Sequence, residues 1–328
     1  MLKNIIKNSI TILIICLIFF LLNSLLNNKS NLYKGLDELE FAINESMHDS
    51  AAFYEALSHT VVDADDTTNS QLFEGSYYAL LIDETNNQVY ASHNAHRRMY
   101  PASMTKLMTA IIVAEKLESG EISEYDVVTV SDYYDLTYDG VAPCDIAYGS
   151  QITVKNLMHG LLIGSNNYYA LILADYIAGS EEAFCEMMNE KAHELGATNT
   201  HFSNPHGLDE PDHYSTAYDI FLILSEADTY EYIRNIDKLS TYSYTYLSPN
   251  GYEVSDETSA TSLIAHGYVT LPSNFSVRTW KTGTTSGAGN CLAICLTKGE
   301  NTYYLVASDG DSRAELYDVI IELLCLVE

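Results

Sequence analysis

Three short strings, in a fixed order, limit what this 328-residue chain can fold into more than any other feature of its sequence. They are S-M-T-K at residues 103–106, S-N-N at 165–167 and K-T-G at 281–283. Written as S-x-x-K, S-x-N and K-T-G, they form a motif set typical of sites in which a serine takes part in acyl transfer. Each string alone can arise by chance. Their order and spacing predict a fold that brings three distant segments into one cleft.

The first string is expected at the start of a buried helix. Pro101 fixes the backbone just before a run in which apolar residues recur at helical spacing. Ser103 and Lys106 then share one helix face, so the amine can reach the hydroxyl. If burial and a second cation such as Lys281 lower the pKa of this amine, the lysine can take the proton of the serine. The alternative is a helix-capping serine followed by a solvated lysine.

The second string lies between two apolar segments, at 157–163 and 171–173. This placement predicts a short polar turn between buried helices. Its hydroxyl and amide groups could pass a proton to a leaving amine and hold a peptide carbonyl. The alternative role is to cap the following helix through Ser165 or Asn166, and the two roles are compatible.

The third string ends a stretch of alternating, β-branched residues at 275–282, which predicts a strand. An edge strand can pair with an extended peptide, and Gly283 would let that peptide approach closely. Lys281 and the hydroxyls of Thr282 and Thr284 could bind a carboxylate. The alternative is a plain strand that ends at Gly283 and carries an exposed lysine.

From about residue 75 to its end, the chain resembles the serine-type D-alanyl-D-alanine carboxypeptidases, which are the low-molecular-mass penicillin-binding proteins. The likeness is strongest at 164–219, with its N-P-H-G-L and H-Y-S-T-A segments, and extends to 77–92, 98–110 and 280–292. The implied fold is α/β in its α+β form and serine β-lactamase/DD-peptidase-like. It has an antiparallel five-stranded sheet flanked by helices and an inserted all-α lobe. The sequence pattern places the lobe before about residue 240, strands near 275–283, 290–297 and 302–308, and a helix at 312–327.

The resemblance also implies roles for individual residues. Ser103 is the nucleophile, Lys106 its general base, and Ser165 passes a proton to the leaving D-alanine. The substrate-binding residues are Asn167, Lys281, Thr282, Gly283 and Thr284. The backbone N–H groups of Ser103 and Thr284 form the oxyanion hole. The implied reaction removes the terminal D-alanine from peptidoglycan stem peptides that end in D-Ala-D-Ala. A β-lactam enters the same first step and stalls, and no metal or cofactor is expected.

The chain departs from the family pattern at two places. Asn166 stands where the family usually has glycine, and Tyr168 and Tyr169 replace small or acidic residues, which puts the shape of the pocket in doubt. Thr279 and Trp280 precede the K-T-G where a glycine-bearing sequence is usual. Trp280, the only tryptophan, is expected to pack in the core.

The N-terminal part predicts a membrane location. Residues 9–26 are almost wholly apolar and follow Lys3 and Lys7, so they can cross a bilayer with the rest of the chain outside the cytoplasm. No small-x-small cleavage site follows, which favours an uncleaved single-pass anchor at 1–27 in the cell membrane. A cleaved signal peptide and a secreted protein are the alternative. An acidic stalk is expected at 28–73 and the catalytic domain at 74–328, without a further β-rich domain.

Charge and cysteine content argue against a nucleic-acid-binding protein and against a disulfide-rich protein. A formal net charge of −29 argues against nucleic acid as a partner. One of the six cysteines, Cys16, lies in the apolar run, and the odd number that remains implies no disulfide framework.

Three other functions share parts of the sequence pattern. A metal-dependent peptidase could use the crowded acidic and histidine residues of the 193–213 stretch, but their spacing matches no H-E-x-x-H signature. These residues are His193, His201, His206, Asp209, Asp212 and His213. A β-lactamase would share the three strings, although no glutamate stands out to activate a deacylating water. A non-hydrolytic wall-binding module on the same fold is the third alternative.

Overall fold

The computed structural model describes residues 77–137, 141–142 and 146–327. The anchor predicted at 1–27 and the stalk predicted at 28–73 lie outside these residues. Within the described ranges, no helix combines the length and the apolar character needed to cross a membrane. The cysteines in these ranges, Cys185, Cys291, Cys295 and Cys325, are free thiols.

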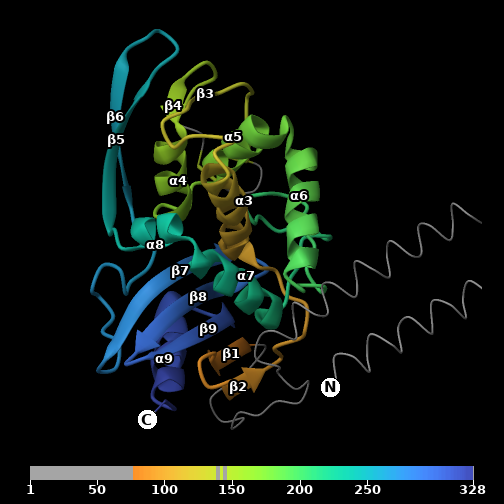
Figure 1. Cartoon of the computed structure of the whole chain (residues 1–328), viewed down its shortest axis with the longest axis vertical. Helices are drawn as coiled ribbons and strands as arrows, with labels where there is room; N and C mark the ends of the chain where they lie inside the picture. Colours follow the sequence, from red (N-terminus) through yellow and green to blue (C-terminus); the bar gives the residue numbers. More distant parts are fainter. Residues whose placement is uncertain (1–76, 138–140, 143–145, 328) are drawn as a thin grey trace, which may run out of the picture. The chain divides into compact units, whose positions relative to one another are not determined.

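A five-stranded antiparallel sheet, in the order β2-β1-β9-β8-β7, forms one half of the molecule (Figure 1). Its strands are β1 (Tyr78–Asp83), β2 (Gln88–His93), β7 (Phe275–Thr285), β8 (Gly289–Lys298) and β9 (Asn301–Gly310). The first strand pairs with the last, in a register that joins Tyr78 to Ser308. The three C-terminal strands predicted from the sequence are therefore confirmed. β7 lies at the edge, so one side of it is open to a peptide.

Helices cover both faces of this sheet. Side chains of a strand point alternately to its two faces, yet β8 is buried at six consecutive positions, which requires cover on each side. α7 (Ala217–Thr229) and α9 (Arg313–Leu324) both pack on β8 and β9. The start of α9 agrees with the prediction, since Ser312 is its N-cap and accepts a hydrogen bond from the Glu315 amide.

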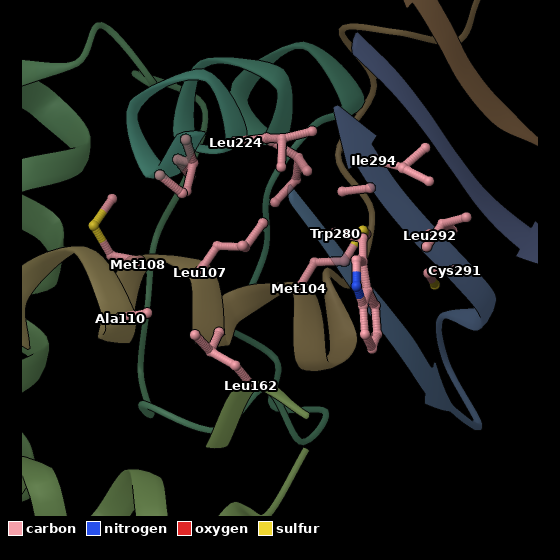
Figure 2. Packing of buried hydrophobic residues seen from close by; sticks show 14 of the residues in the cluster. Met104, Leu107, Met108, Ala110, Leu162, Leu224, Trp280, Cys291, Leu292 and Ile294 are labelled. Atoms are coloured by element: carbon pink, nitrogen blue, oxygen red, sulfur yellow. The ribbon is translucent and has the colours of Figure 1, made fainter. Parts of the chain in front are cut away.

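The inserted lobe is built around one buried helix, α3 (Lys106–Glu118), which contacts all the other main helices of the lobe. These are α4 (Val154–Leu162), α5 (Asn167–Ala178), α6 (Glu181–Glu194), α7 and α8 (Glu231–Asp237). A short 3₁₀ turn, η2 (Ala102–Thr105), leads into α3. Figure 2 shows Trp280 beside Met104, between the start of α3 and the sheet. Trp280 is 1 % exposed, so its predicted place in the core is confirmed.

The lobe is not all-α, and this part of the expectation was wrong. It carries a second antiparallel sheet in the order β3-β4-β5-β6. Its strands are β3 (Val127–Thr129), β4 (Gln151–Thr153), β5 (Thr241–Leu247) and β6 (Glu253–Ser259). β3 and β4 are only three residues long, which is too short for a periodic pattern to be seen. β6 has the polar sequence EVSDETS, which lacks the apolar alternation of a half-buried strand. Backbone pairing with β5 holds β6 in place instead.

Candidate active site

The three strings meet where the helical lobe joins the open edge of the five-stranded sheet. Lys106 Nζ lies 2.9 Å from Ser103 Oγ and 2.7 Å from Asn167 Oδ1, which joins the first string to the second. Lys281 Nζ lies 2.9 Å from Ser165 Oγ, which joins the second string to the third. The structure therefore brings the three strings together, as predicted.

The first string begins in a 3₁₀ turn and not in the α-helix itself. Ser103 lies in η2 and Lys106 is the first residue of α3, but their spacing still brings the two side chains together. Strand β7 packs closely against this turn. A Cβ built on Gly283 of β7 would lie 2.8 Å from Ala102 Cβ and 3.0 Å from the Ser103 nitrogen. Glycine at this position therefore lets the β7 backbone reach the Ser103 amide.

Lys106 is fully buried and surrounded by neutral acceptors. Its amine contacts Ser103 Oγ, Asn167 Oδ1 and, at 2.6 Å, the carbonyl oxygen of His206. Burial first, and then the positive charge of Lys281, hold the pKa of Lys106 well below its usual value. Both effects favour the neutral form of the amine.

A neutral amine at this position has a specific hydrogen-bond arrangement. It offers two N–H donors and one lone pair. The His206 carbonyl and the Asn167 side-chain oxygen can only accept, so they take the two N–H groups. The lone pair is left for the hydroxyl of Ser103, which can donate its proton. This is the geometry of a general base beside a nucleophile.

The second string combines both of the roles expected for it. Asn166 is the N-cap of α5, and its side chain accepts hydrogen bonds from the Tyr168 and Tyr169 amides. Ser165 has a φ of 58°, a left-handed conformation that is rare outside glycine and tends to occur at functional sites. The rings of Tyr168 and Tyr169 are buried in the lobe. The hydroxyl of Tyr169 lies 2.6 Å from that of Tyr244 on β5.

Lys281 is the second buried lysine of the site. Its amine donates to Ser165 Oγ and, at 3.1 Å, to the carbonyl oxygen of Thr282. Burial lowers the pKa of Lys281 to about 7, and the nearby carboxyl group of Asp237 opposes this shift. Asp237 accepts a hydrogen bond from the Trp280 amide at 3.1 Å, so the unusual residue before the K-T-G is tied to the helical lobe.

The remaining predicted residues follow Lys281 along the same edge strand. Thr282 Oγ1 lies 2.5 Å from Thr261 Oγ1, and Thr284 Oγ1 donates to the Gly283 carbonyl at 2.7 Å. Thr261 was not predicted. Its amide donates to the Ile163 carbonyl at 3.2 Å, which connects the chain after β6 to the turn that carries Ser165. No side-chain pattern in the sequence distinguishes Thr261 from other surface threonines.

The N-P-H-G-L segment was noticed in the sequence but given no role. The structure packs it against the start of α3. The His206 carbonyl receives Lys106, and the Pro205 carbonyl accepts from Thr109 Oγ1 at 2.7 Å. A Cβ on Gly207 would lie 1.9 Å from the Ala102 oxygen. This segment therefore forms a backbone wall behind the serine and the lysine.

The residues considered for a metal site have separate hydrogen-bonding partners. His213 Nε2 lies 2.8 Å from Thr105 Oγ1, and burial lowers the pKa of His213 to about 3. His201 Nδ1 lies 2.6 Å from the Asp212 carbonyl oxygen. Asp209 accepts from Thr285 Oγ1 at 2.6 Å. Among the residues that the structure describes, no three His, Cys, Asp or Glu side chains are grouped as metal ligands would be.

Similarity to solved structures supports this fold. The crystal structure of the Streptomyces K15 DD-transpeptidase matches with a TM-score of 0.68 at 23% identity, covering 76% of this chain and 95% of that one. The D-alanyl-D-alanine carboxypeptidase DacD from Francisella tularensis matches with a TM-score of 0.65 at 21% identity, covering 81% and 73%. At these identities the likeness shows the fold alone.

Sequence comparison gives the family. DacC of Escherichia coli, a D-alanyl-D-alanine carboxypeptidase, is 32% identical over 257 residues, which is 76% of this chain and 60% of DacC. The carboxypeptidase DacF of Bacillus subtilis is 38% identical over 169 residues, 52% of this chain and 43% of DacF. The matches thus span about two fifths to three fifths of these relatives. A protein-family model described as D-alanyl-D-alanine carboxypeptidase matches residues 65–311. The chain belongs to the D-alanyl-D-alanine carboxypeptidase family.

Proposed function

We propose that this chain is a serine D-alanyl-D-alanine carboxypeptidase that acts through an acyl-enzyme on Ser103. The observation that carries the proposal is the environment of Lys106, a buried amine that lies 2.9 Å from Ser103 Oγ and has neutral acceptors as its other partners. Ser103 Oγ attacks the carbonyl carbon of the penultimate D-alanine while its proton moves to Lys106 Nζ. The C–N bond then breaks, and D-alanine leaves as an amine that receives a proton through Ser165.

The second half of the reaction restores the enzyme. Water attacks the acyl ester, Lys106 takes a proton from that water, and Ser103 leaves as the free hydroxyl. Substrate binding is assigned to Asn167, which contacts Lys106, and to the open edge of β7. On that edge, Lys281 with Thr282, Gly283 and Thr284 would hold the terminal carboxylate and the peptide backbone. A β-lactam would acylate Ser103 and remain bound, which makes it a covalent inhibitor.

We further propose that the chain is held at the cell membrane by a single N-terminal span, with the cleft outside the cytoplasm. Support comes from the sequence, in which residues 9–26 are apolar and follow two lysines. The stem peptides of peptidoglycan are outside the cytoplasm, so this placement would bring enzyme and substrate together.

The proposal is tested by exposing the full chain, in detergent, to benzylpenicillin and following its intact mass. We expect a persistent adduct on the peptide that contains Ser103. We also expect release of D-alanine from a pentapeptide ending in D-Ala-D-Ala, at a rate that a metal chelator does not change. Hydrolysed drug without an adduct would point to a β-lactamase. Intact drug, with no adduct and no release of D-alanine, would favour a wall-binding module. Loss of D-alanine release in the presence of the chelator would favour a metal-dependent enzyme.

The two buried lysines predict a bell-shaped pH profile of kcat/KM for D-alanine release. Activity should rise with pH as Lys106 becomes neutral, because only the neutral amine can accept a proton. It should fall again as pH passes the pKa of Lys281, about 7, because the neutral amine no longer attracts a carboxylate. Measuring kcat/KM from about pH 5 to about pH 10 checks this. In Lys281→Arg the falling limb should move to higher pH, since arginine keeps its charge. A wild-type kcat/KM that stays constant as the pH rises past about 7 would contradict the role assigned to Lys281.

A further inference from the structure

The segment that follows β6 leads from the helical lobe back to the five-stranded sheet. Near its start, the Thr261 amide donates a hydrogen bond to the Ile163 carbonyl in the lobe at 3.2 Å. Two residues later, the Leu263 amide donates to the hydroxyl of Tyr317 on α9 at 2.9 Å. Residues 261–263 are therefore held by their backbone to both halves of the molecule.

These contacts place the side chain of Thr261 beside the K-T-G string. Thr261 Oγ1 lies 2.5 Å from Thr282 Oγ1, and both residues are half-buried. In the described part of the chain, neither hydroxyl has another hydrogen-bond partner. A hydroxyl has one donor and two acceptor lone pairs, so each of the two threonines can still bind a further group.

The direction of this hydrogen bond is decided when a carboxylate binds. A carboxylate can only accept hydrogen bonds. Under the proposed function, the Thr282 hydroxyl gives its single hydrogen to the terminal carboxylate of the substrate. It then has no hydrogen left for Thr261, so the hydrogen between the two threonines must come from Thr261.

Other kinds of side chain at position 261 would weaken the binding of the carboxylate. A group that can only accept would draw the Thr282 hydrogen away from the substrate. An apolar group would leave the Thr282 hydroxyl free to turn. A donor at 261 holds the Thr282 hydroxyl in the orientation that the carboxylate needs, and it strengthens that hydroxyl as a donor, because hydrogen bonds in a chain polarise one another.

We infer that Thr261 is a positioning residue for the terminal carboxylate of the substrate, because it donates to Thr282 Oγ1 and directs the Thr282 hydrogen towards that carboxylate. The inference rests on the proposed function, in which the carboxylate lies at Lys281 and Thr282. The pocket for the carboxylate is then completed by a segment that comes from the lobe, and not by the edge strand alone.

The first test is a double-mutant cycle of Thr261→Val and Thr282→Val, since valine resembles threonine without the hydroxyl. It is read as kcat/KM for D-alanine release from a pentapeptide ending in D-Ala-D-Ala, and as the rate of acylation by benzylpenicillin, which also carries a carboxylate. We expect Thr261→Val to lower both about three- to tenfold when Thr282 is present, and to have no further effect when Thr282 is valine.

Two single variants accompany the cycle. Thr261→Ser keeps the donor and should recover most of the activity lost in Thr261→Val. Thr270→Val is the matched control, because Thr270 is an exposed threonine of the same connection between β6 and β7. It should release D-alanine at the wild-type rate.

The second test separates a positioning role from a general structural one. D-alanine takes the terminal carboxylate with it, so hydrolysis of the acyl-enzyme formed from the peptide should be as fast in Thr261→Val as in the wild type. A distortion of the whole site would slow acylation and hydrolysis alike. Single-turnover measurements give the two rates separately. Thr261→Ala takes the place of the valine variant if thermal unfolding shows that valine prevents folding.

Wild-type acylation by Thr261→Val, or equal losses with and without Thr282, would overturn the positioning role. So would a loss that Thr261→Ser does not recover, or equal slowing of acylation and hydrolysis. Each of these results leaves the proposed function in place, provided that the wild-type protein forms the penicillin adduct and releases D-alanine. Absence of both in the wild-type protein would overturn the two proposals together.

Discussion

Lys106→Met is expected to slow acylation by benzylpenicillin about 10²- to 10⁴-fold without lowering the thermal stability of the protein. The rate should fall because the Ser103 hydroxyl loses the group that accepts its proton. Stability should be kept because the amine is fully buried, and burial disfavours its charged form, as the lowered pKa of Lys106 shows. Methionine has a similar length and no charge, so the variant avoids the cost of burying an amine. This gain offsets the loss of the donor to Asn167 Oδ1 and to the His206 carbonyl oxygen.

Two measurements check this prediction, the rate of adduct formation by intact mass and the midpoint of thermal unfolding. Ser103→Ala sets the lower limit of the rate, since no adduct can form. Lys116→Met is the control, because Lys116 makes an exposed ion pair with Glu121 at 2.7 Å and lies outside the site. It should acylate at the wild-type rate. Wild-type acylation by Lys106→Met would show that another group accepts the proton.

Gly207→Ala is expected to damage stability and activity together. The new Cβ would lie 1.9 Å from the Ala102 oxygen and 2.5 Å from its carbonyl carbon, and Gly207 has a φ of +91°. Both close contacts are with backbone atoms of Ala102, so the clash can be removed only if η2 or the 205–207 segment moves. Because η2 carries Ser103 and His206 holds Lys106, either movement separates the serine from the lysine. We expect a loss of about 3 kcal/mol or more in the free energy of unfolding. Acylation should slow about 100-fold or more, as misplaced catalytic groups do.

Urea unfolding and the rate of penicillin adduct formation give the two quantities. The matched control is Gly251→Ala, where φ is +77° but no atom lies within 4 Å of the new Cβ. That variant should lose only the cost of a left-handed alanine, about 1–2 kcal/mol, and should acylate normally. Equal losses in the two variants would falsify the claim that close packing behind Ser103 fixes the site.

The convergence of the candidate site's side chains could be predicted because these residue types occur at fixed spacings along the sequence. Ser103 and Lys106 are three residues apart, and an alternating pattern placed Lys281 on a strand. The His206 carbonyl could not be predicted in the same way, because every residue has a carbonyl and only the fold decides which one faces Lys106. Thr261 was missed for a similar reason, since its contact with Thr282 depends on where β6 ends.

The architecture shows the same division between local and long-range information. The buried helix α3 and the strands β7 to β9 have apolar patterns that reflect their burial, and they were predicted within a few residues. The β5–β6 hairpin was not, because the polar sequence of β6 shows no alternation of apolar and polar residues, although β6 pairs with β5 across a short turn. Local periodicity reports burial, so a polar strand that is held mainly by backbone pairing lacks the pattern by which buried strands are predicted.

The pairing of β1 with β9 has a consequence for how the chain folds. Residues 78 and 308 are partners, so β1 can pair early with β2 but must wait for almost the whole chain to be synthesised before β9, its other neighbour, exists. Contacts of such long sequence separation are slow to form, whereas α3 to α8 are joined by nearer contacts and can assemble earlier. We therefore expect the helical wall of the cleft to form first and the sheet wall last. A nascent chain would remain inactive until its final strands are released from the ribosome.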